Sequence, residues 1–375
     1  VLIAVALLLA VLPQQAKADA PTPDTSWYKE TDDSFTLADA DDLAGLAQLV
    51  NDGNTFTGKT ILLANDISLI TYTNWTPIGT EAHPFKGTFD GAGKKITNLS
   101  FNGSTAVNVG LFGYVWPGTL KNVSIETVNI TAKEAVGSLV GSMNGSIENV
   151  HVSGVTINST HWAGGIVGYH YGDMSSCSAI NATITLTFDT SISDNGDKAG
   201  GLIGYHGEGN YAINDCTAQN VSVTGVRDVG GLVGTAQAGN VFTNCHVIDS
   251  TVTASNATFV HSNPYAGGLI GRVANATVTL QYSSAVDVTV TSYVDGFAGN
   301  LVGGPAANWV NLPVMLVHDG TANFYSTIQA GINAASAGDT VNVAAGTYVE
   351  NVVVNKAITL QGAGSENTTI VATDG

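Results

Sequence analysis

AGGIVG, residues Ala163 to Gly168, is one of seven close copies of a single phrase: a small or β-branched residue, glycine, large apolar residues and a closing glycine. The copies are VGLFG (109–113), VGSLVG (136–141), AGGIVG (163–168), AGGLIG (199–204), VGGLVG (229–234), AGGLIG (266–271) and AGNLVG (298–303). Their closing glycines, 27 to 37 residues apart, are Gly113, Gly141, Gly168, Gly204, Gly234, Gly271 and Gly303. A repeat of this period is typical of a solenoid, in which each unit buries its apolar face against its neighbours.

Each phrase is followed by a loop and then by strand-like sequence. An equivalent position, 9 to 12 residues past the closing glycine, is occupied in turn by Val123, Val150, Cys177, Cys216, Cys245 and Tyr282. An alternating run follows, such as VHVSGVTIN (150–158), and this alternation is the signature of a half-buried strand. The pattern predicts about three short strands per turn, stacked into an all-β, right-handed parallel β-helix with short helical caps and an interior ladder at the equivalent position.

The repeats do not fill the chain, and six segments are expected. Residues 1–18 have the apolar run and Ala16-Lys17-Ala18 site of a signal peptide without its positive start, although an uncleaved anchor is an alternative. Residues 19–35 are expected to form a linker, 36–108 a cap helix (36–50) with the first coils, and 109–303 the seven repeats. Residues 304–325 are expected as a second linker, and 326–375 as the start of a second, truncated β-helix of a longer protein.

Composition excludes one class of partner. The chain has 12 basic and 30 acidic residues, a net charge of −18, and its arginines are Arg227 and Arg272. A surface that tracks phosphates needs clustered basic residues, so we expect no nucleic-acid binding. Twelve Asn-x-Ser/Thr triplets are potential glycosylation sites, or chance products of a sequence rich in Asn and Thr.

The three cysteines share one repeat position with two valines, which favours buried free thiols over a disulfide. No C-x-x-C pair is present, so we expect no metal there. His170 and His206 each follow a tyrosine two residues past a closing glycine. They could lie about 5 Å apart in stacked coils, near the strand spacing, as a metal site or, preferably, as an exposed aromatic-polar ladder.

Other candidate sites are weaker. The loop from Ser193 to Asp197 has oxygen ligands and a glycine, as calcium loops do, but lacks the distal glutamate of an EF-hand. The runs Thr183-Ile-Thr, Thr251-Val-Thr and Thr289-Val-Thr would suit an ice-binding row, but unequal repeat lengths argue against a flat face. No pair of carboxylates or basic residue stands out as catalytic, so we expect neither a catalytic residue nor a cofactor.

The glycine phrases between Val109 and Gly303 resemble the GLUG-motif repeats of large secreted and surface proteins of bacteria and archaea, and FKGTFDGAGKKITNLSF (85–101) resembles their usual lead-in. The tail STIQAGINAASAGDTVNVAAGTYVENVVVNKAITLQGAG (326–364) resembles the opening of right-handed β-helices of the pectin-lyase-like class. These resemblances imply a fold and an extracellular setting, and supply no catalytic residue.

The sequence therefore predicts an exported, non-catalytic repeat protein of the cell surface, adhesin-like or part of a stalk. Glycans or other surface proteins are the expected partners, and the mature chain is expected to have no transmembrane span. The alternative is a scaffold or binding module of a secreted polysaccharide lyase or hydrolase, with its catalytic coils further along the protein.

Overall fold

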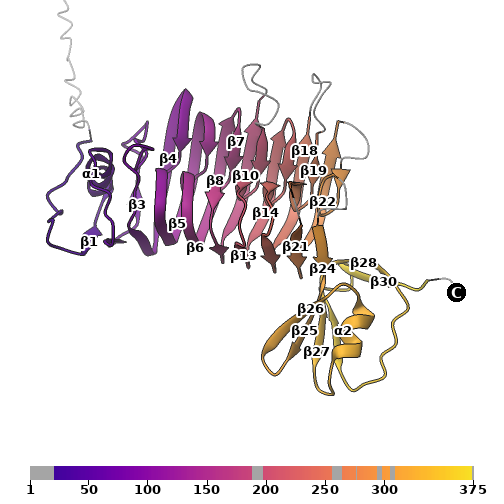
Figure 1. The fold of residues 1–375 in the computed structure, drawn as a ribbon. Helices are drawn as coiled ribbons and strands as arrows, with labels where there is room; N and C mark the ends of the chain where they lie inside the picture. The colour runs from indigo at the N-terminus through magenta and orange to yellow at the C-terminus, as the bar shows by residue number, and fades with distance from the viewer. Residues whose placement is uncertain are drawn as a thin grey trace, which may run out of the picture.

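The molecule is a rod of stacked coils with a smaller unit beside its far end (Figure 1). This computed structural model describes residues 21–187, 197–255, 264–275, 277–293, 298–304 and 309–373. The expected signal peptide and Ser193 to Gly196 lie outside these ranges. None of the helices within them is long and apolar enough to cross a bilayer.

Parallel pairing from coil to coil builds the rod, which is a right-handed parallel β-helix as expected. Its first strands are β1 (Ser34–Leu37), β2 (Thr60–Leu63) and β3 (Ile67–Ser68), followed by three long strands that bend around the coil, β4 (Thr88–Val109), β5 (Phe112–Val136) and β6 (Val140–Ser159). Beyond β6 the strands form four stacks, so a coil has four short segments where three were expected.

The first stack contains the opening residues of each glycine phrase: β7 (Trp162–Gly164), β11 (Lys198–Gly200), β15 (Asp228–Gly230), β19 (Ala266–Gly267) and β23 (Ala298–Gly299). The second ends the phrase: β8 (Val167–Tyr171), β12 (Ile203–His206), β16 (Val233–Ala236) and β20 (Ile270–Val273). The third is β9 (Met174–Ser175), β13 (Ala212–Asn214), β17 (Val241–Thr243), β21 (Val278–Gln281) and β24 (Trp309–Leu312). The fourth is β10 (Ser178–Leu186), β14 (Thr217–Gly225), β18 (His246–Ala254) and β22 (Ser284–Ser292).

The closing glycines share one register and lie where two walls of the coil touch. Gly168, for example, lies in the second stack. An added Cβ there would lie 2.3 Å from the backbone nitrogen of Val136, the residue of β5 that pairs with β7 of the first stack. At Gly271 the added Cβ would lie 2.4 Å from the nitrogen of Val229. Real Cβ atoms do not approach backbone this closely, so close approach, rather than left-handed backbone, explains the repeated glycine.

Two corners of each coil are left-handed. The first corner has φ near +50° at Asn122, Asn149 and Asn244, and the second at Asn181 and Asn220. Asparagine tolerates this conformation better than most residues. Its side chain also bonds to the preceding coil: Asn149 Nδ2 donates to Asn122 Oδ1 at 3.0 Å, and Asn244 Nδ2 donates to Asp215 Oδ1 at 2.7 Å. These amide ladders tie successive corners together.

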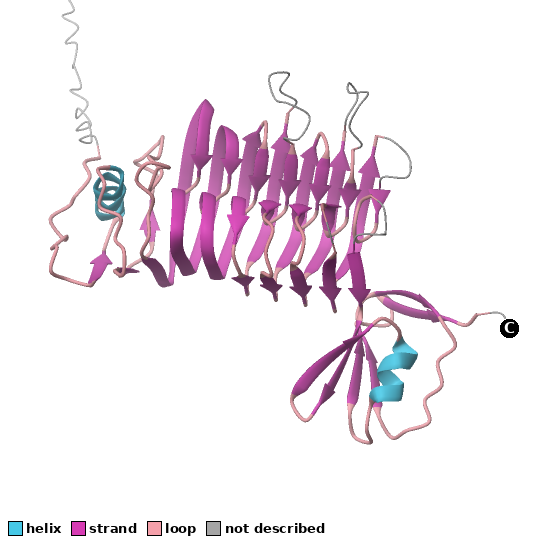
Figure 2. Ribbon diagram, viewed as in Figure 1, coloured by secondary structure: helices cyan, strands magenta, loops and turns pink. Residues whose placement is uncertain are grey.

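A helix caps the first coil, as expected, and its N-terminal capping residue explains where it begins. Helix α1 (Ala40–Asn51) is the cyan helix at the first end of the rod in Figure 2. It begins after Asp39, whose side chain accepts hydrogen bonds from the backbone of Asp41 and Asp42. The expected linker 19–35 was drawn too long, because β1 begins at Ser34 and Trp27 packs its ring 5.5 Å from that of Phe35. These aromatic contacts bury the end of the rod.

The expected linker 304–325 contains three strands instead. Strand β24 pairs with β21 in the rod, while β25 (Val314–His318) and β26 (Thr321–Tyr325) form an antiparallel hairpin. Hydrophobic residues at alternate positions of β25, Val314 and Leu316, are buried in a second apolar core, which a linker would not form.

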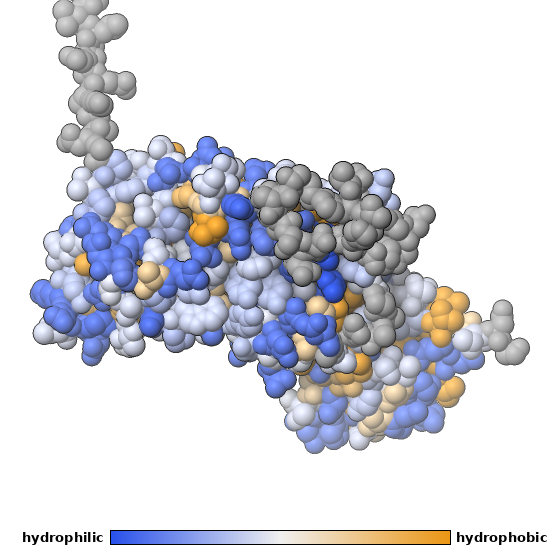
Figure 3. Space-filling view, turned by 45° about the horizontal axis from the view of Figure 1, so that its top comes forward, coloured by the Kyte–Doolittle hydropathy of each residue, from blue (hydrophilic) through white to orange (hydrophobic). Residues whose placement is uncertain are grey.

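The second core lies under helix α2 (Ile328–Ala334), and the strands after it are β27 (Thr340–Val343), β28 (Gly346–Val349), β29 (Thr359–Gly362) and β30 (Thr368–Val371). The pairs β27–β29 and β28–β30 are parallel, as in a β-helix coil, although the unit opens with the antiparallel hairpin. The largest hydrophobic areas visible in Figure 3 lie on this unit, where Val349 and Val353 are more than half exposed.

Five of the six expected interior-ladder residues are fully buried and in register: Val123, Val150, Cys177, Cys216 and Cys245. The prediction that Tyr282 is the sixth member of the interior ladder was wrong. Pairing of His246 with Ser284 places Ser283 opposite Cys245, and Ser283 is buried. Tyr282 has φ of 49° and occupies the left-handed corner instead, where the other coils have Asn, Asp or Ser.

We predict that Gly168→Ala destabilises the rod by about 2 to 3 kcal/mol, because the new methyl group must displace backbone rather than side chain. Gly103→Ala is the control, since its nearest neighbours are tip atoms of the Phe101 ring, 3.0 Å away, which can move. Urea unfolding measures both. Equal midpoints for the two variants would contradict the role given to the closing glycines.

Candidate functional site

Two columns of side chains run along the rod on either side of the glycine phrases. One column is the residue directly before each of the first six phrases: Asn108, Ala135, Trp162, Lys198, Asp228 and Tyr265. The other is the residue directly after each closing glycine: Tyr114, Ser142, Tyr169, Tyr205, Thr235 and Arg272. Because the glycines let the two walls touch, the two columns lie side by side.

The columns are aromatic in the middle of the rod. The rings of Trp162 and Tyr169 stack at 4.7 Å with an interplanar angle of 26°, and those of Tyr169 and Tyr205 at 4.9 Å with an angle of 6°. Tyr169 Oη donates to Tyr171 Oη at 2.9 Å, and the Tyr171 ring meets the edge of Trp116 at 6.0 Å. The result is a continuous, rigid platform of rings.

Three rings of this platform, Trp116, Trp162 and Tyr169, line a cleft of about 390 Å³, which we call the aromatic cleft. Its lining residues are Glu81, Val107, Asn108, Tyr114, Trp116, Glu134, Ser142, Trp162 and Tyr169. Polar groups are fixed between the rings: Ser142 Oγ donates to Asn108 Oδ1 at 2.5 Å. An apolar aromatic wall with a few held polar groups is the usual composition of a small-molecule or oligomer site.

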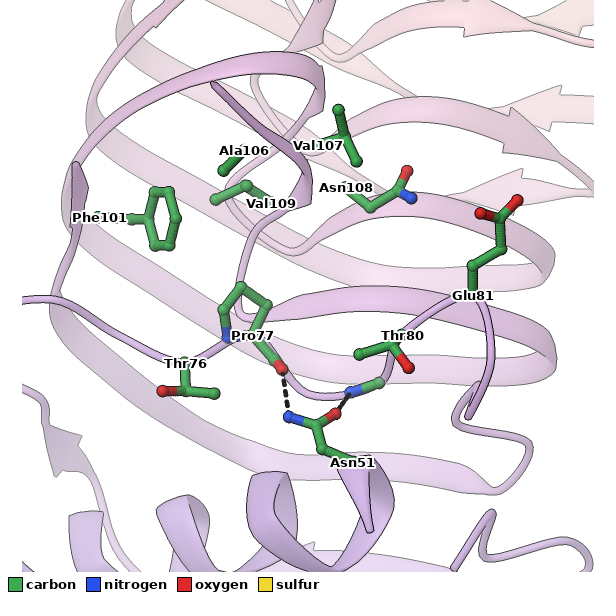
Figure 4. A pocket seen from close by; sticks show the side chains of 11 residues that line it. Asn51, Thr76, Pro77, Thr80, Glu81, Phe101, Ala106, Val107, Asn108 and Val109 are labelled. Carbon is green, nitrogen blue, oxygen red and sulfur yellow. Dashed lines mark hydrogen bonds between the residues drawn. The ribbon is translucent and has the colours of Figure 1, made fainter. Parts of the chain in front are cut away.

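A second hollow, of about 370 Å³, adjoins the aromatic cleft and shares Glu81, Val107 and Asn108 with it (Figure 4). Its floor is held by Asn51, whose amide donates to Pro77 O at 3.1 Å and accepts from Gly79 N at 2.9 Å. In Figure 4 the Phe101 ring stands across the hollow from Glu81. The two hollows together make an elongated depression along the early coils.

Glu134 in the cleft and Lys198 beside the platform are each held by a neighbouring group. Glu134 Oε2 lies 3.4 Å from His161 Nδ1, and this contact is the main cause that lowers the pKa of Glu134, so its carboxylate stays ionised at neutral pH. Lys198 Nζ lies 5.7 Å from the Tyr205 ring centre and 6.0 Å from that of Trp162. Burial lowers the pKa of Lys198 to about 8, and the rings stabilise its charge.

The two columns change from aromatic to ionic further along the rod. Asp228 Oδ2 accepts from Thr235 Oγ1 at 2.8 Å and lies 3.7 Å from an Arg272 nitrogen. One position earlier in each coil, Glu134, His161, Asp197 and Arg227 lie in sequence along the rod, so acidic and basic residues alternate. Burial raises the pKa of Asp197 to about 6. Alternating charges of this kind favour one order of neighbouring coils, so these residues have a structural role.

His170 and His206 correct the expectation of an exposed ladder. Their ring centres are 5.2 Å apart, as stacking predicts, but both side chains are fully buried. Pairing places them in a core column with Met143, Ala236 and Val273, while the preceding tyrosines form the platform. Burial lowers the pKa of His170 to about 4 and that of His206 well below its usual value, so both are neutral.

Among the described residues, no three His, Cys, Asp or Glu side chains lie together in a group that could hold a metal ion. Cys177, Cys216 and Cys245 are free thiols. Burial raises the pKa of Cys177 well above its usual value, which makes it unreactive. Apart from Asp197, the expected calcium loop lies outside the described residues.

The sequence points to only part of the cleft. Tyr169 and Tyr205 stood out because they recur after the closing glycine. Trp162 could have been found from its place directly before a phrase, but the residues at that place are chemically unlike one another, so no repeat draws attention to it. Asn108, like Trp162, lies directly before a phrase, whereas Glu81 and Trp116 come from elsewhere and have no sequence signal.

Comparison with known proteins gives limited matches. No family model matches the chain, so membership of the GLUG repeats stays a prediction. Over 128 residues the chain is 31% identical to halomucin of Haloquadratum walsbyi (strain DSM 16790 / HBSQ001), a match that covers 34% of this chain and 1% of halomucin. A crystal structure described as a candidate immunoglobulin A1 protease of Bacteroides ovatus has a TM-score of 0.48, 18% identity, and 74% of each chain covered.

The buried histidines predict acid sensitivity. They are neutral in the folded chain, but in the unfolded chain they take up protons near pH 6.5, so the unfolded state gains protons first as pH falls. We expect the free energy of unfolding to fall between pH 6.5 and pH 4, by up to about 1.4 kcal/mol per pH unit for each histidine.

The matched variant is His170→Met with His206→Met, which copies Met143 of the same column. Urea unfolding at pH 7 and pH 4.5 should show a smaller loss of stability on acidification in this variant than in the native chain. An unchanged loss would mean that other groups cause the acid sensitivity.

Proposed function

We propose that the chain is part of an exported, non-catalytic surface protein that binds glycans in the aromatic cleft. The observation that carries the proposal is the aromatic lining of the cleft by Tyr114, Trp116, Trp162 and Tyr169. Sugar rings have apolar C–H faces, which stack on aromatic faces, and hydroxyl groups, which need hydrogen-bond partners at the rim. Asn108, Ser142 and the two glutamates supply such partners.

Charge favours a neutral glycan over an acidic one. The cleft contains Glu81 and Glu134, and the whole chain has a net charge of −18. A uronic acid or a sulfated sugar would meet like charge at the rim, whereas hydroxyl groups can donate hydrogen bonds to both carboxylates. We therefore assign neutral hexose or N-acetylhexosamine oligomers as the ligand class.

An extracellular setting agrees with the expected signal peptide and with the partial similarity to halomucin. The rod has a regular, hydrogen-bonded surface and short loops for much of its length, which suits a stalk exposed to proteases. These points support display at a cell surface.

An enzyme is the second candidate, because the cleft holds two carboxylates. Glycoside hydrolysis requires one carboxyl group that is protonated at working pH and donates to the leaving oxygen. The His161 contact keeps Glu134 ionised, which opposes that role for it. Hydrolysis of a bound oligosaccharide that is lost in Glu134→Gln would favour the enzyme over the binding protein.

We predict that Trp162→Ala and Tyr169→Ala each weaken binding of the best neutral glycan by about tenfold or more, since each removes a ring from the platform. Tyr293→Ala is the control, because Tyr293 is 63% exposed and does not line the cleft. An array of neutral and acidic glycans identifies the ligand, and calorimetry measures its affinity. Strongest binding to acidic glycans, or no loss in both cleft variants, would contradict this assignment.

A further inference from the structure

A second surface of the rod is uniform from coil to coil. It lies on the last part of β4, β5 and β6 and on β10, β14, β18 and β22, which stack side by side (Figure 1). We call it the hydroxyl face. It consists of two columns: Ser100, Asn129, Thr156, Thr183, Ser222, Thr251 and Thr289, and Asn102, Thr131, Asn158, Thr185, Thr224, Thr253 and Thr291.

The unequal repeat lengths do not disturb this face. Thr183 pairs directly with Thr156 and Ser222, and Thr251 pairs with Thr289, although the intervening segments differ in length. The extra residues are accommodated outside the paired strands. The expectation that variable repeats prevent a regular threonine face was therefore wrong, because register is set by the paired strands and not by the loops.

The side chains of the hydroxyl face are available to solvent. None of them is buried, and most are exposed. Within the described residues, none of these side chains makes a hydrogen bond to another part of the protein. The residues between the two columns, such as Ile157 and Ile184, are buried and hold the backbone flat against the core.

Comparison with neighbouring columns shows that this uniformity is not a general property of the rod. The strands just before the second left-handed corner have two columns of their own, which are exposed or half-exposed except at the buried Ser284. They are Lys95, Ser124, His151, Ser178, Thr217, His246 and Ser284, and Thr97, Glu126, Ser153, Ile180, Gln219, Ile248 and Val286. These columns mix charged, aromatic and aliphatic residues, whereas the hydroxyl face has only Ser, Thr and Asn.

We propose that the hydroxyl face binds the surface of ice crystals. Neighbouring coils place equivalent side chains about 4.8 Å apart, and alternate residues of a strand are about 6.6 Å apart. This makes a near-rectangular lattice whose repeats are close to those of oxygen atoms on a prism face of ice. Threonine is β-branched and stiff at χ1, so the lattice keeps its spacing without a ligand.

The chemistry of the face also fits a neutral, ordered water lattice. Each threonine presents a hydroxyl group, which can take the place of a lattice water, beside a methyl group, which leaves neighbouring water to bond to itself. No charged side chain lies in either column to impose a different hydration pattern. An uncharged face in a chain of net charge −18 has no electrostatic attraction for ionic partners.

The test is partition of the full chain into slowly growing ice, with thermal hysteresis as a second measurement. The native chain should enter the ice fraction, and Thr183→Lys and Thr251→Lys should each be excluded from it, since a lysine on the flat face holds the lattice away. Ser153→Lys is the matched control for charge, because Ser153 lies in the mixed column, and it should partition like the native chain.

Three outcomes would overturn the proposal. They are exclusion of the native chain from ice, equal partition of native and Thr→Lys chains, and capture of the native chain by crystalline cellulose but not by ice. Far-UV circular dichroism of each variant checks the fold, and the two threonine positions lie in different coils, so one suffices if the other unfolds. Loss of glycan binding in the cleft variants would leave these results unchanged.

Discussion

The structure depends on direct contact between two backbones at the closing glycine of each repeat. At this point two walls of a coil approach so closely that even a methyl group would meet backbone, as at Gly168 and Val136. Elsewhere the coil is filled by stacked aliphatic side chains, which tolerate exchange among Val, Ile, Leu and Cys. The glycine contact tolerates no exchange, and it therefore recurs in all seven phrases.

That contact also builds the candidate site. Because the walls touch, the residue before a phrase and the residue after it become neighbours. Trp162 therefore stacks on Tyr169, and a bulky side chain in place of the closing glycine would keep the two rings apart. Parallel pairing then repeats each position along the rod. One register thus produces three kinds of side-chain array: an aromatic platform, a column of alternating charges around the buried Asp197 and Arg227, and a face of hydroxyl groups.

The fold class can be predicted from the sequence because the spacing of the glycine phrases and the alternation within the strands reveal the periodicity of the coil. The buried cysteines followed as well, because they share a position with Val123 and Val150. The prediction placed Tyr282 one residue away from its true position. It counted residues from the closing glycine, and the sequence does not reveal that the loop after that glycine is longer in this coil than in the preceding one. The cleft could not be predicted, because Glu81, Asn108 and Trp116 converge only through coil stacking.

The central claim is that one register aligns the repeats despite their unequal lengths. It is tested most directly by the distance between spin labels at positions 156 and 289, in a chain with Cys177, Cys216 and Cys245 replaced by valine. These positions are four coil spacings apart, so the account predicts a narrow distribution near roughly 19 Å between backbones. A broad distribution, or one centred well beyond this distance, would contradict it.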